Sequence, residues 1–361
     1  MAIESERVAQ TVLPDWRGFN LVDFEYPTEP DASFEATTED DFRWISDWGF
    51  NFVRLPMAYP RWLDYDPSKP ITVDQVYDVK ESALEEIDRL VELGRKYSVH
   101  VSLNFHRGPG FCINPGFREP FDLWRDKEAQ DAFCFHWAIF ARRYRSLSPK
   151  EISFNLLNEP CVWDQNEPLA AKLAVPDEVF RSVNEAAVKA IREFNPEHLV
   201  ICDGNRAGRI PSRTLEDLGV AQSCRSYSPV PLTHYDVPWQ VSEEPFPEPV
   251  WPGVRGDGKW DDAGLWDGRR LEQQFAPWIE LARRGSGVHC GECGCYSRTP
   301  HTVFLAWFRD VLDILKGAGI GFALWNFRGA FGVLDTGRTD VAYEDWHGHQ
   351  LDRQLLDLML A

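Results

Sequence analysis

The stretch ISFNLLNEP, residues 152–160, is an apolar run that ends in an amide, a carboxylate and a proline. Its length and its β-branched and aromatic residues are typical of a buried strand. Asn158 and Glu159 follow this strand directly, and an apolar strand has no structural need for two adjacent polar side chains at its end. The stretch therefore predicts a strand that delivers functional groups at its carboxyl end.

Similar runs recur along the chain, and helical patterns separate them. The other β-rich runs are residues 16–21, 50–57, 99–106, 199–205, 221–228, 287–292 and 321–329. Helices are predicted at 37–49, 80–94, 128–145, 177–194, 269–284, 301–319 and 350–360, with a short one at 212–219. A threonine is predicted to cap the first of these helices, and glycines at 49 and 94 are predicted to end the first two.

Eight β/α repeats predict an α/β protein with a closed (β/α)8 or TIM barrel. A doubly wound sheet is the structural alternative, but no glycine-rich phosphate loop follows the run at 16–21. Residues 229–266, rich in Pro, Trp and Gly, are predicted to form a long loop after the sixth strand. No linker interrupts the pattern, so we expect residues 1–361 to form one domain.

The composition favours a neutral substrate. The chain has a formal net charge of −19, which argues against nucleic acid and anionic membranes as partners. It also contains 15 Trp, whose ring faces can stack on the apolar faces of sugars. Nothing in the sequence points to a particular oligomeric state.

The N-terminal residues MAIESERVAQTVLPDW lack the basic region and apolar core of a secretory signal. No segment has the roughly 20 apolar residues of a membrane helix. We therefore expect a cytoplasmic protein, or an exported one if a leader was removed.

The stretch HCGECGC, residues 289–295, is a weak candidate for a metal site. Cys290 and Cys293 have the spacing of a zinc half-site, but no second pair of this kind occurs elsewhere. Buried reduced thiols are the better interpretation.

A second carboxylate is predicted at the same level of the barrel as Glu159. Glu292 ends the seventh β-rich run, and the carboxyl ends of barrel strands carry the active site. A retaining glycosidase needs two carboxyl groups roughly 5–5.5 Å apart, one as acid/base and one as nucleophile. Arg54, at the end of the second run, can keep such a nucleophile ionised.

The motifs FNLLNEP, NFVRLP, LNFH and LWNFRG together resemble the retaining glycoside hydrolases of family 5, the cellulase-type group of the 4/7 superfamily. The resemblance covers about residues 13–360. It implies that Glu159 is the acid/base, that Glu292 is the nucleophile and that Arg54 supports Glu292. It further implies that His106 shapes the floor near Asn158, that Asn158 binds the substrate 2-hydroxyl, and that Trp325 is the sugar platform.

One position departs from the family pattern. The family usually shows His-x-Tyr after the sixth strand, whereas this chain has Arg225 in the place of the His and Tyr227 in the place of the Tyr. We expect the Tyr227 hydroxyl to bond the nucleophile, and His234 and Tyr235 to come from the loop, with His234 lining the pocket. Arg225 adds positive charge beside the carboxylates.

The resulting hypothesis is a hydrolase that cleaves β-glycosidic bonds by double displacement, with β-1,4-glucan or its oligosaccharides as first choice. This chemistry requires no cofactor and no metal. β-Mannan, short β-glycosides cleaved in exo mode, and an unusual linkage are the alternatives. A non-catalytic carbohydrate-binding barrel and a metal-dependent barrel hydrolase are rivals, but both carboxylates are present and the first strand has no H-x-H.

Overall fold

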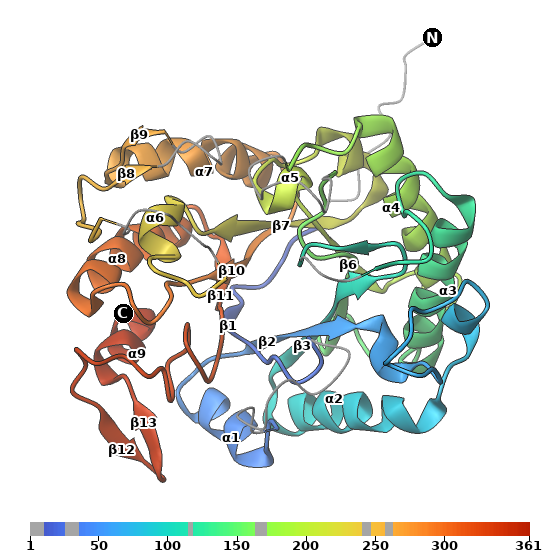
Figure 1. Ribbon diagram of the computed structural model, residues 1–361, viewed down its shortest axis with the longest axis horizontal. Helices are drawn as coiled ribbons and strands as arrows, with labels where there is room; N and C mark the ends of the chain where they lie inside the picture. The colour runs from blue at the N-terminus through green and yellow to red at the C-terminus, as the bar shows by residue number, and fades with distance from the viewer. Residues whose placement is uncertain (1–10, 26–35, 115–117, 163–171, 240–246, 257–262) are drawn as a thin grey trace.

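The computed structural model describes residues 11–25, 36–114, 118–162, 172–239, 247–256 and 263–361. Within these residues the chain alternates parallel strands with helices, and the helices surround the strands on the outside (Figure 1). The parallel strands are β1 (Arg17–Asn20), β2 (Phe52–Ala58), β3 (His100–Gly108), β5 (Ile152–Asn155), β6 (Leu199–Asp203), β7 (Ala221–Ser226), β10 (Val288–Cys293) and β11 (Gly321–Leu324).

The parallel strands close into a barrel. Their order is β2-β1-β11-β10-β7-β6-β5-β3, and the further pairing of β2 with β3 joins the two ends of this series. Each strand coincides with one of the predicted β-rich runs, so the (β/α)8 barrel is confirmed and the doubly wound sheet is excluded.

The helices of the outer ring bury one apolar side against the strands. They are α1 (Glu39–Asp47), α2 (Glu85–Tyr97), α3 (Lys127–Arg143), α4 (Asp177–Arg192), α7 (Gly268–Arg283), α8 (His301–Gly317) and α9 (Arg353–Leu360). Helix α1 begins as the sequence predicts. Thr38 caps it, and Thr38 and Asp41 exchange hydrogen bonds in a capping box. A 3₁₀ helix, Arg213–Leu218, stands where the short helix is predicted.

The predicted stop at Gly94 is wrong. Helix α2 continues to Tyr97 and ends at Ser98, whose φ of 57° is left-handed. A Cβ on Gly94 would lie 2.3 Å from Val101 Cγ2 and 2.7 Å from the Val99 carbonyl oxygen. This glycine is therefore a point of close approach between helix and strand rather than a cap.

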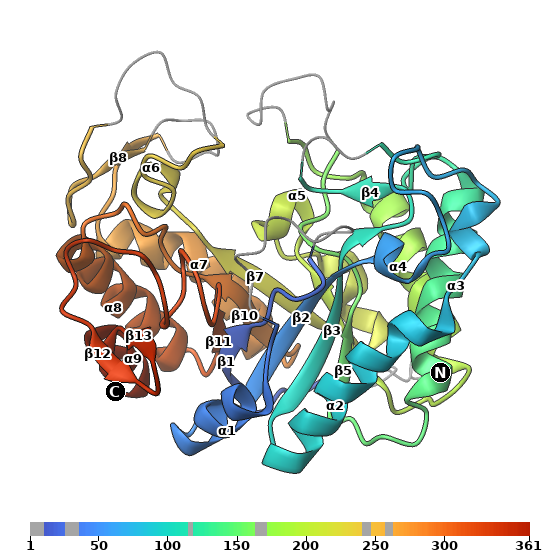
Figure 2. The same ribbon diagram turned by 60° about the horizontal axis from the view of Figure 1, so that its bottom comes forward.

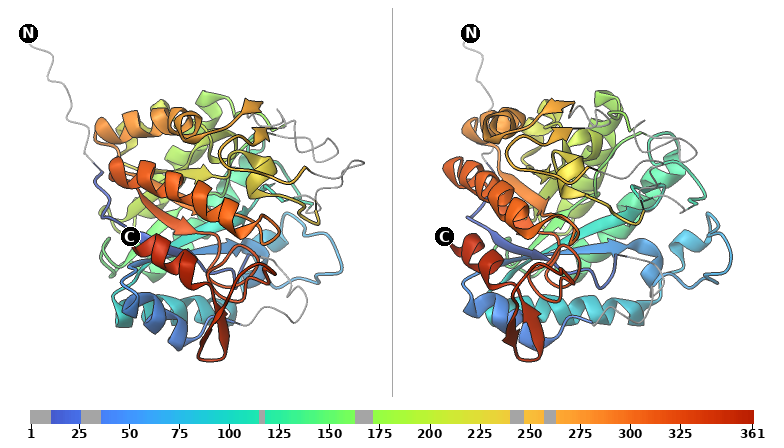
Figure 3. Two further views of the ribbon diagram at one scale, coloured as in Figure 1. Left: turned by 90° about the vertical axis from the view of Figure 1, so that its left-hand side faces the viewer. Right: turned by 60° about the vertical axis from the view of Figure 1, so that its left-hand side comes forward.

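The C-terminal helix also starts later than predicted, since residues 349–351 form a strand. Strands β12 (Glu344–Trp346) and β13 (His349–Leu351) make a hairpin that projects beside α1 (Figure 3). Trp44 of α1 stacks on His347 of this hairpin, with ring centroids 5.3 Å apart.

The loops after the strands gather at one end of the barrel (Figure 2). The long segment after β7 carries α6 (Val230–Thr233), β8 (Arg255–Gly256) and β9 (Gly264–Leu265) in its described residues. The same end holds β4 (Phe111–Cys112) and α5 (Asn205–Gly208).

A small apolar layer closes the other end of the barrel interior, formed by Trp16, Phe52, Ile201, Ala221 and Ala323. Side chains two residues apart on a strand point to the same face, so Arg54 lies above Phe52 inside the barrel. None of the helices in the described part of the chain combines the length and the apolarity that a bilayer crossing requires.

Candidate active site

The site begins with Arg54, a fully buried guanidinium on β2. It donates from Nε to Asn155 Oδ1 at 2.8 Å and from Nη1 to Asn20 Oδ1 at 3.0 Å. Its Nη1 also donates to Glu292 Oε1 at 2.6 Å, and Nη2 donates to Asn158 Oδ1 at 2.7 Å. Arg54 therefore ties β1, β10, β5 and the loop that follows β5 to one rigid planar group.

Glu292, on β10, is surrounded by donors. Arg54 reaches Oε1 at 2.6 Å, Arg225 Nη2 lies 3.2 Å from the same oxygen, and the Tyr227 hydroxyl donates to Oε2 at 3.1 Å. Burial and the Glu292 charge raise the pKa of Tyr227 well above its usual value, so this phenol keeps its proton and remains a donor. These contacts fix the position of the Glu292 carboxylate.

Glu159 follows β5 and has a different environment. Its side chain is 18% exposed, and its backbone φ of 48° lies in the left-handed region that non-glycine residues rarely adopt. The backbone N–H donates to Asp203 Oδ2 at 2.9 Å, which holds this conformation. Burial, and then the charge of Glu292, raise the pKa of Glu159 to about 7, against the effects of Arg225 and Lys172.

Arg225, on β7, bridges the two carboxylates. Its Nε lies 3.4 Å from Glu159 Oε1 and its Nη2 lies 3.2 Å from Glu292 Oε1. Nη2 also donates to Asn158 Oδ1 at 2.8 Å and to Asp203. One guanidinium thus contacts both glutamates. The two carboxyl groups are therefore close enough to be bridged by a single planar group.

The predicted residue Asn158 is fixed by the two arginines. Its Oδ1 accepts from both Arg54 and Arg225, and its backbone N–H donates to the Phe105 carbonyl. With the amide oxygen held in this way, the Nδ2 group is the end of the side chain that can donate to a ligand.

Several residues of this network were not singled out from the sequence. Asp203, at the end of β6, is completely buried and accepts from Asn155, Glu159 and Arg225. Asn20, at the end of β1, accepts from Arg54 and donates to the Gly291 carbonyl. A signal was available for Asp203, because a carboxylate follows the apolar run LVIC, as Glu159 follows its own strand.

His106 and Trp325 form the opposite flank of the site, on β3 and after β11. Their rings stack with centroids 5.7 Å apart, and the Trp325–Asn326 peptide bond is cis. Burial lowers the pKa of His106 to about 3, so the ring is neutral, and its Nε2 accepts from Asn114 at 3.2 Å. The structure thus places His106 beside Trp325 and Asn114, and shows no bond from its side chain to Asn158 within the described residues.

Tyr227 also begins an aromatic cluster. His234 meets its ring edge-to-face at 5.1 Å and Phe331 lies 6.3 Å from it, while Trp239, 54% exposed, lies 6.4 Å from His234. Burial lowers the pKa of His234 to about 4. Tyr235 is half-buried in the next turn, without a hydrogen bond to the glutamates in the described chain.

The other loop aromatics mostly pack into the protein. Tyr59, Trp62 and Trp266 are buried, and Trp124 and Trp251 pack against the core. Trp163 and Trp260 lie outside the described residues.

The cysteines near Glu292 are buried thiols. Cys290, Cys293 and Cys295 are all enclosed, and His289 packs on Phe52 with ring centroids 4.5 Å apart. Among the residues that the structure describes, no group of three or more His, Cys, Asp and Glu side chains could hold a metal ion.

A closed parallel barrel with two glutamates at the ends of its fourth and seventh strands, bridged by arginine, has the arrangement of a barrel glycoside hydrolase. Comparisons with known proteins agree. The family model for cellulase, glycosyl hydrolase family 5, matches residues 8–330. The chain belongs to this family and is a glycoside hydrolase.

Relatives of similar length support the assignment. Endoglucanase C of Acetivibrio thermocellus is 26% identical over 328 residues, 85% of this chain and 89% of that protein. Cellodextrinase A of Ruminococcus flavefaciens is 28% identical over 78% of this chain and 76% of its own length. A crystal structure of a glycoside hydrolase matches with a TM-score of 0.84 and 34% identity, covering 96% of this chain and 99% of that one.

Proposed function

We propose that this chain, as one catalytic domain, hydrolyses β-1,4-linked glucan or its oligosaccharides with retention of configuration, Glu159 serving as acid/base and Glu292 as nucleophile. The observation that carries the assignment is the unequal environment of the two carboxyl groups. Glu292 receives contacts from Arg54, Arg225 and Tyr227, whereas Glu159 has a pKa raised to about 7. Two carboxyl groups with different surroundings divide the acid and nucleophile roles between them.

The first step forms a covalent sugar–enzyme bond. A Glu292 oxygen attacks the anomeric carbon while the Glu159 proton passes to the departing glycosidic oxygen. Arg54 and Tyr227 hold Glu292 in a fixed position by bonds to different oxygens. The reaction therefore needs little reorganisation of the site.

The second step releases the sugar. Glu159, now ionised, takes a proton from water, and the water oxygen attacks the anomeric carbon and displaces Glu292. The same group acts as acid and then as base, which a pKa close to 7 permits at neutral pH.

The surrounding residues support a sugar between the two glutamates. The Asn158 amide, fixed through its oxygen, is suited to donate to the 2-hydroxyl next to the reacting carbon. The partly exposed Trp325 ring offers an apolar face for the sugar ring. Relatives named as an endoglucanase and a cellodextrinase favour a β-glucan as substrate.

The nucleophile assignment is tested with Glu292→Ala and an activated aryl β-cellobioside. We expect turnover to fall by at least about 10⁴-fold, because the covalent step is lost, and added azide to restore it by attacking from the vacated side. The product is then the glycosyl azide of inverted configuration, identified by NMR.

Glu86→Ala, a change at an exposed glutamate of α2, is the control and should leave turnover unaltered. Substantial residual activity in Glu292→Ala without azide, giving the usual product, would remove Glu292 from the nucleophile role.

A further inference from the structure

Asp203, the last residue of β6, is a buried carboxylate that neither reaction step uses. Its Oδ2 accepts from Arg225 Nη2 and, at 2.9 Å, from the Glu159 backbone N–H. Its Oδ1 accepts from Asn155 Nδ2 at 2.9 Å, and Arg54 Nη2 lies 3.9 Å from Oδ2. Enclosing a carboxylate is costly unless its partners compensate it, and here the partners are the groups that surround the acid/base.

The end of β6 and the turn after it hold the backbone around Glu159 from two sides. Asp203 accepts from the Glu159 N–H, and the Ala207 N–H donates to the carbonyl of the next residue, Pro160, at 2.9 Å. The φ of Glu159 is 48°, and residues 206 and 207 are also left-handed, with φ of 52° and 59°. Non-glycine residues rarely adopt such angles unless surrounding contacts impose them. These two hydrogen bonds therefore fix where the Glu159 side chain starts.

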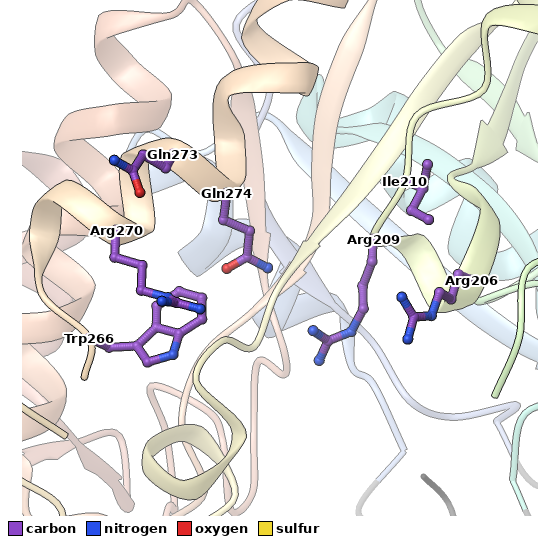
Figure 4. Close-up of a pocket in the computed structure, with 7 residues that line it drawn as sticks. All are labelled: Arg206, Arg209, Ile210, Trp266, Arg270, Gln273 and Gln274. Atoms are coloured by element: carbon purple, nitrogen blue, oxygen red, sulfur yellow. The ribbon is translucent and has the colours of Figure 1, made fainter. Parts of the chain in front are cut away.

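The same turn also fixes Arg225. A Cβ on Gly208 would lie 2.6 Å from Arg225 Cγ, and the φ of this glycine is 74°. The side chains of the segment line a separate cavity toward α7, as Figure 4 shows for Arg206, Arg209 and Ile210. The segment after Asp203 thus presents side chains to that cavity and the bare backbone of Gly208 to the stem of Arg225.

A guanidinium beside an acid/base group has a cost for catalysis. Arg225 Nε lies 3.4 Å from Glu159 Oε1, and a nearby positive charge favours the ionised form of a carboxyl group. In the described residues, the ion pairs of the site join two guanidinium groups to three carboxyl groups, which belong to Arg54, Arg225, Asp203, Glu159 and Glu292. Negative charges on Asp203 and Glu292 balance both guanidinium groups and allow Glu159 to stay neutral.

The electrostatic effects on Glu159 agree with this balance. Burial is the main cause that raises its pKa, and the Glu292 charge is the next. The charge of Asp203 acts in the same direction, whereas Arg225 and Lys172 act against it. Asp203 therefore offsets part of what the neighbouring guanidinium does to the acid.

We propose that Asp203 is a positioning residue for the acid/base group: it fixes the Glu159 backbone and neutralises Arg225, so that Glu159 keeps its proton beside a guanidinium. This role rests on the function proposed above and deepens it. Asp203 and Arg225 form one unit, in which the arginine bridges the two glutamates and the aspartate compensates its charge.

The other titratable groups around this unit do not interfere between pH 5 and pH 8. Burial lowers the pKa of His106 to about 3 and raises that of Cys161 to about 12. It also raises the pKa of Cys202 and of Tyr227. The remaining charged groups that face the unit are present in every variant below, namely Arg54, Lys172 and Glu292.

The experiment measures kcat/KM between pH 5 and pH 8 for the wild type, Asp203→Asn, Arg225→Gln and the double variant. One substrate is an unactivated cello-oligosaccharide, whose leaving oxygen needs a proton, and the other is a dinitrophenyl β-cellobioside, whose leaving group does not. The matched control is Asp217→Asn, at an aspartate that also accepts from an arginine, Arg181, but whose side chain is 60% exposed.

We expect the two single variants to shift the alkaline decline of the cello-oligosaccharide in opposite directions. Asp203→Asn leaves Arg225 uncompensated, so the decline should begin about one pH unit lower, and the ratio of kcat/KM at pH 8 to that at pH 5 should fall about tenfold. Arg225→Gln should move the decline to higher pH, and the double variant should lie between the two. Asp217→Asn should match the wild type. Turnover of the dinitrophenyl substrate shows that a variant is folded, and its pH dependence should not change.

A purely structural role predicts a different result. If Asp203→Asn lost activity equally on both substrates, with its alkaline decline at the wild-type pH, the positioning role would be overturned and the proposed function would stand. If Asp203→Asn cleaved neither substrate, Arg225→Gln would decide, because a decline that stayed in place or moved to lower pH would contradict the charge compensation. A wild-type enzyme that cleaved neither substrate would instead contradict the proposed function itself.

Discussion

At the scale of single residues, two glutamates acquire different chemistry from their neighbours. Glu292 is held by two guanidinium groups and a phenol, and Glu159 has one arginine contact at 3.4 Å and partial exposure. The cost of enclosing the Glu159 carboxylate, increased by the Glu292 charge, raises its pKa to about 7. A carboxyl group with such a pKa keeps a proton at neutral pH, as the proposed acid role of Glu159 requires.

This pKa predicts the alkaline side of the pH profile. For an unactivated cello-oligosaccharide, kcat/KM should fall about tenfold per pH unit above roughly pH 7, because only protonated Glu159 can assist departure. A dinitrophenyl glycoside needs no such proton, so its kcat/KM should lack this decline. A profile with the same alkaline decline for both substrates would contradict the acid role of Glu159.

The sequence was sufficient to predict that Glu159, Glu292 and Arg54 lie close together, because the two glutamates stand at the carboxyl ends of apolar strands. The expectation that Arg54 ends its strand is wrong: it is the third residue of β2, and its long side chain reaches Glu292 from within the barrel. The sequence was insufficient for Asp203, whose importance depends on contacts with Arg225 and with the Glu159 backbone. Nor could the left-handed φ of Glu159 be predicted, because nothing in the local sequence Asn-Glu-Pro requires a positive φ at the glutamate.

At the scale of elements, the ends of helices could be predicted where they depend only on residues next to one another in the sequence. The Thr38 cap of α1 is confirmed, since the capping box involves only residues within one turn. The stop at Gly94 is wrong because that glycine serves a tertiary contact with the Val99–Val101 segment, which lies outside the helical pattern. The hairpin of β12 and β13 was also missed, because its strands are only three residues long.

Gly94→Ala tests this interpretation. Alanine normally stabilises a helix relative to glycine, but here its Cβ would lie 2.3 Å from a Val101 methyl carbon. We expect the free energy of unfolding to decrease by about 1–3 kcal/mol, measured by urea denaturation. The matched change is Gly317→Ala in α8, where no atom lies within 4 Å of the added Cβ, and it should be neutral or stabilising by up to about 1 kcal/mol. Equal stabilisation of both variants would show that α2 and β3 do not pack this closely.

At the scale of the whole molecule, the barrel is what brings the site together. Arg54, Glu159, Arg225 and Glu292 come from widely separated parts of the sequence, and the pairing of β2 with β3 closes the ring that carries them. The number and order of strands could be predicted because each β/α repeat has its own apolar pattern. The contacts across the barrel interior could not, because they depend on strand register.

The burial of Glu159 has a consequence for the stability of the whole fold. Its folded-state pKa of about 7 lies above the ordinary value of 4.5, so the folded protein holds this proton more tightly than the unfolded chain. This tighter binding contributes on the order of 3 kcal/mol to the free energy of unfolding. The contribution is fully present below about pH 4.5 and is lost as the pH rises through 7.

Glu159→Gln removes this dependence, because glutamine does not ionise. We expect the variant to gain stability relative to the wild type between pH 5 and pH 8, as measured by urea denaturation at both values. Glu86→Gln, at an exposed glutamate, should show no such change. A difference between Glu159→Gln and the wild type that is equal at the two pH values would contradict the raised pKa.

The most direct test of the central claim is to trap the covalent intermediate. The enzyme is incubated with an activated 2-deoxy-2-fluoro β-cellobioside, which forms the glycosyl–enzyme but releases it slowly, and is then analysed by intact and peptide mass spectrometry. The account predicts one added cellobiosyl group per chain, attached to Glu292. Attachment to Glu159, or complete turnover of the natural substrate with inversion and no adduct, would contradict it.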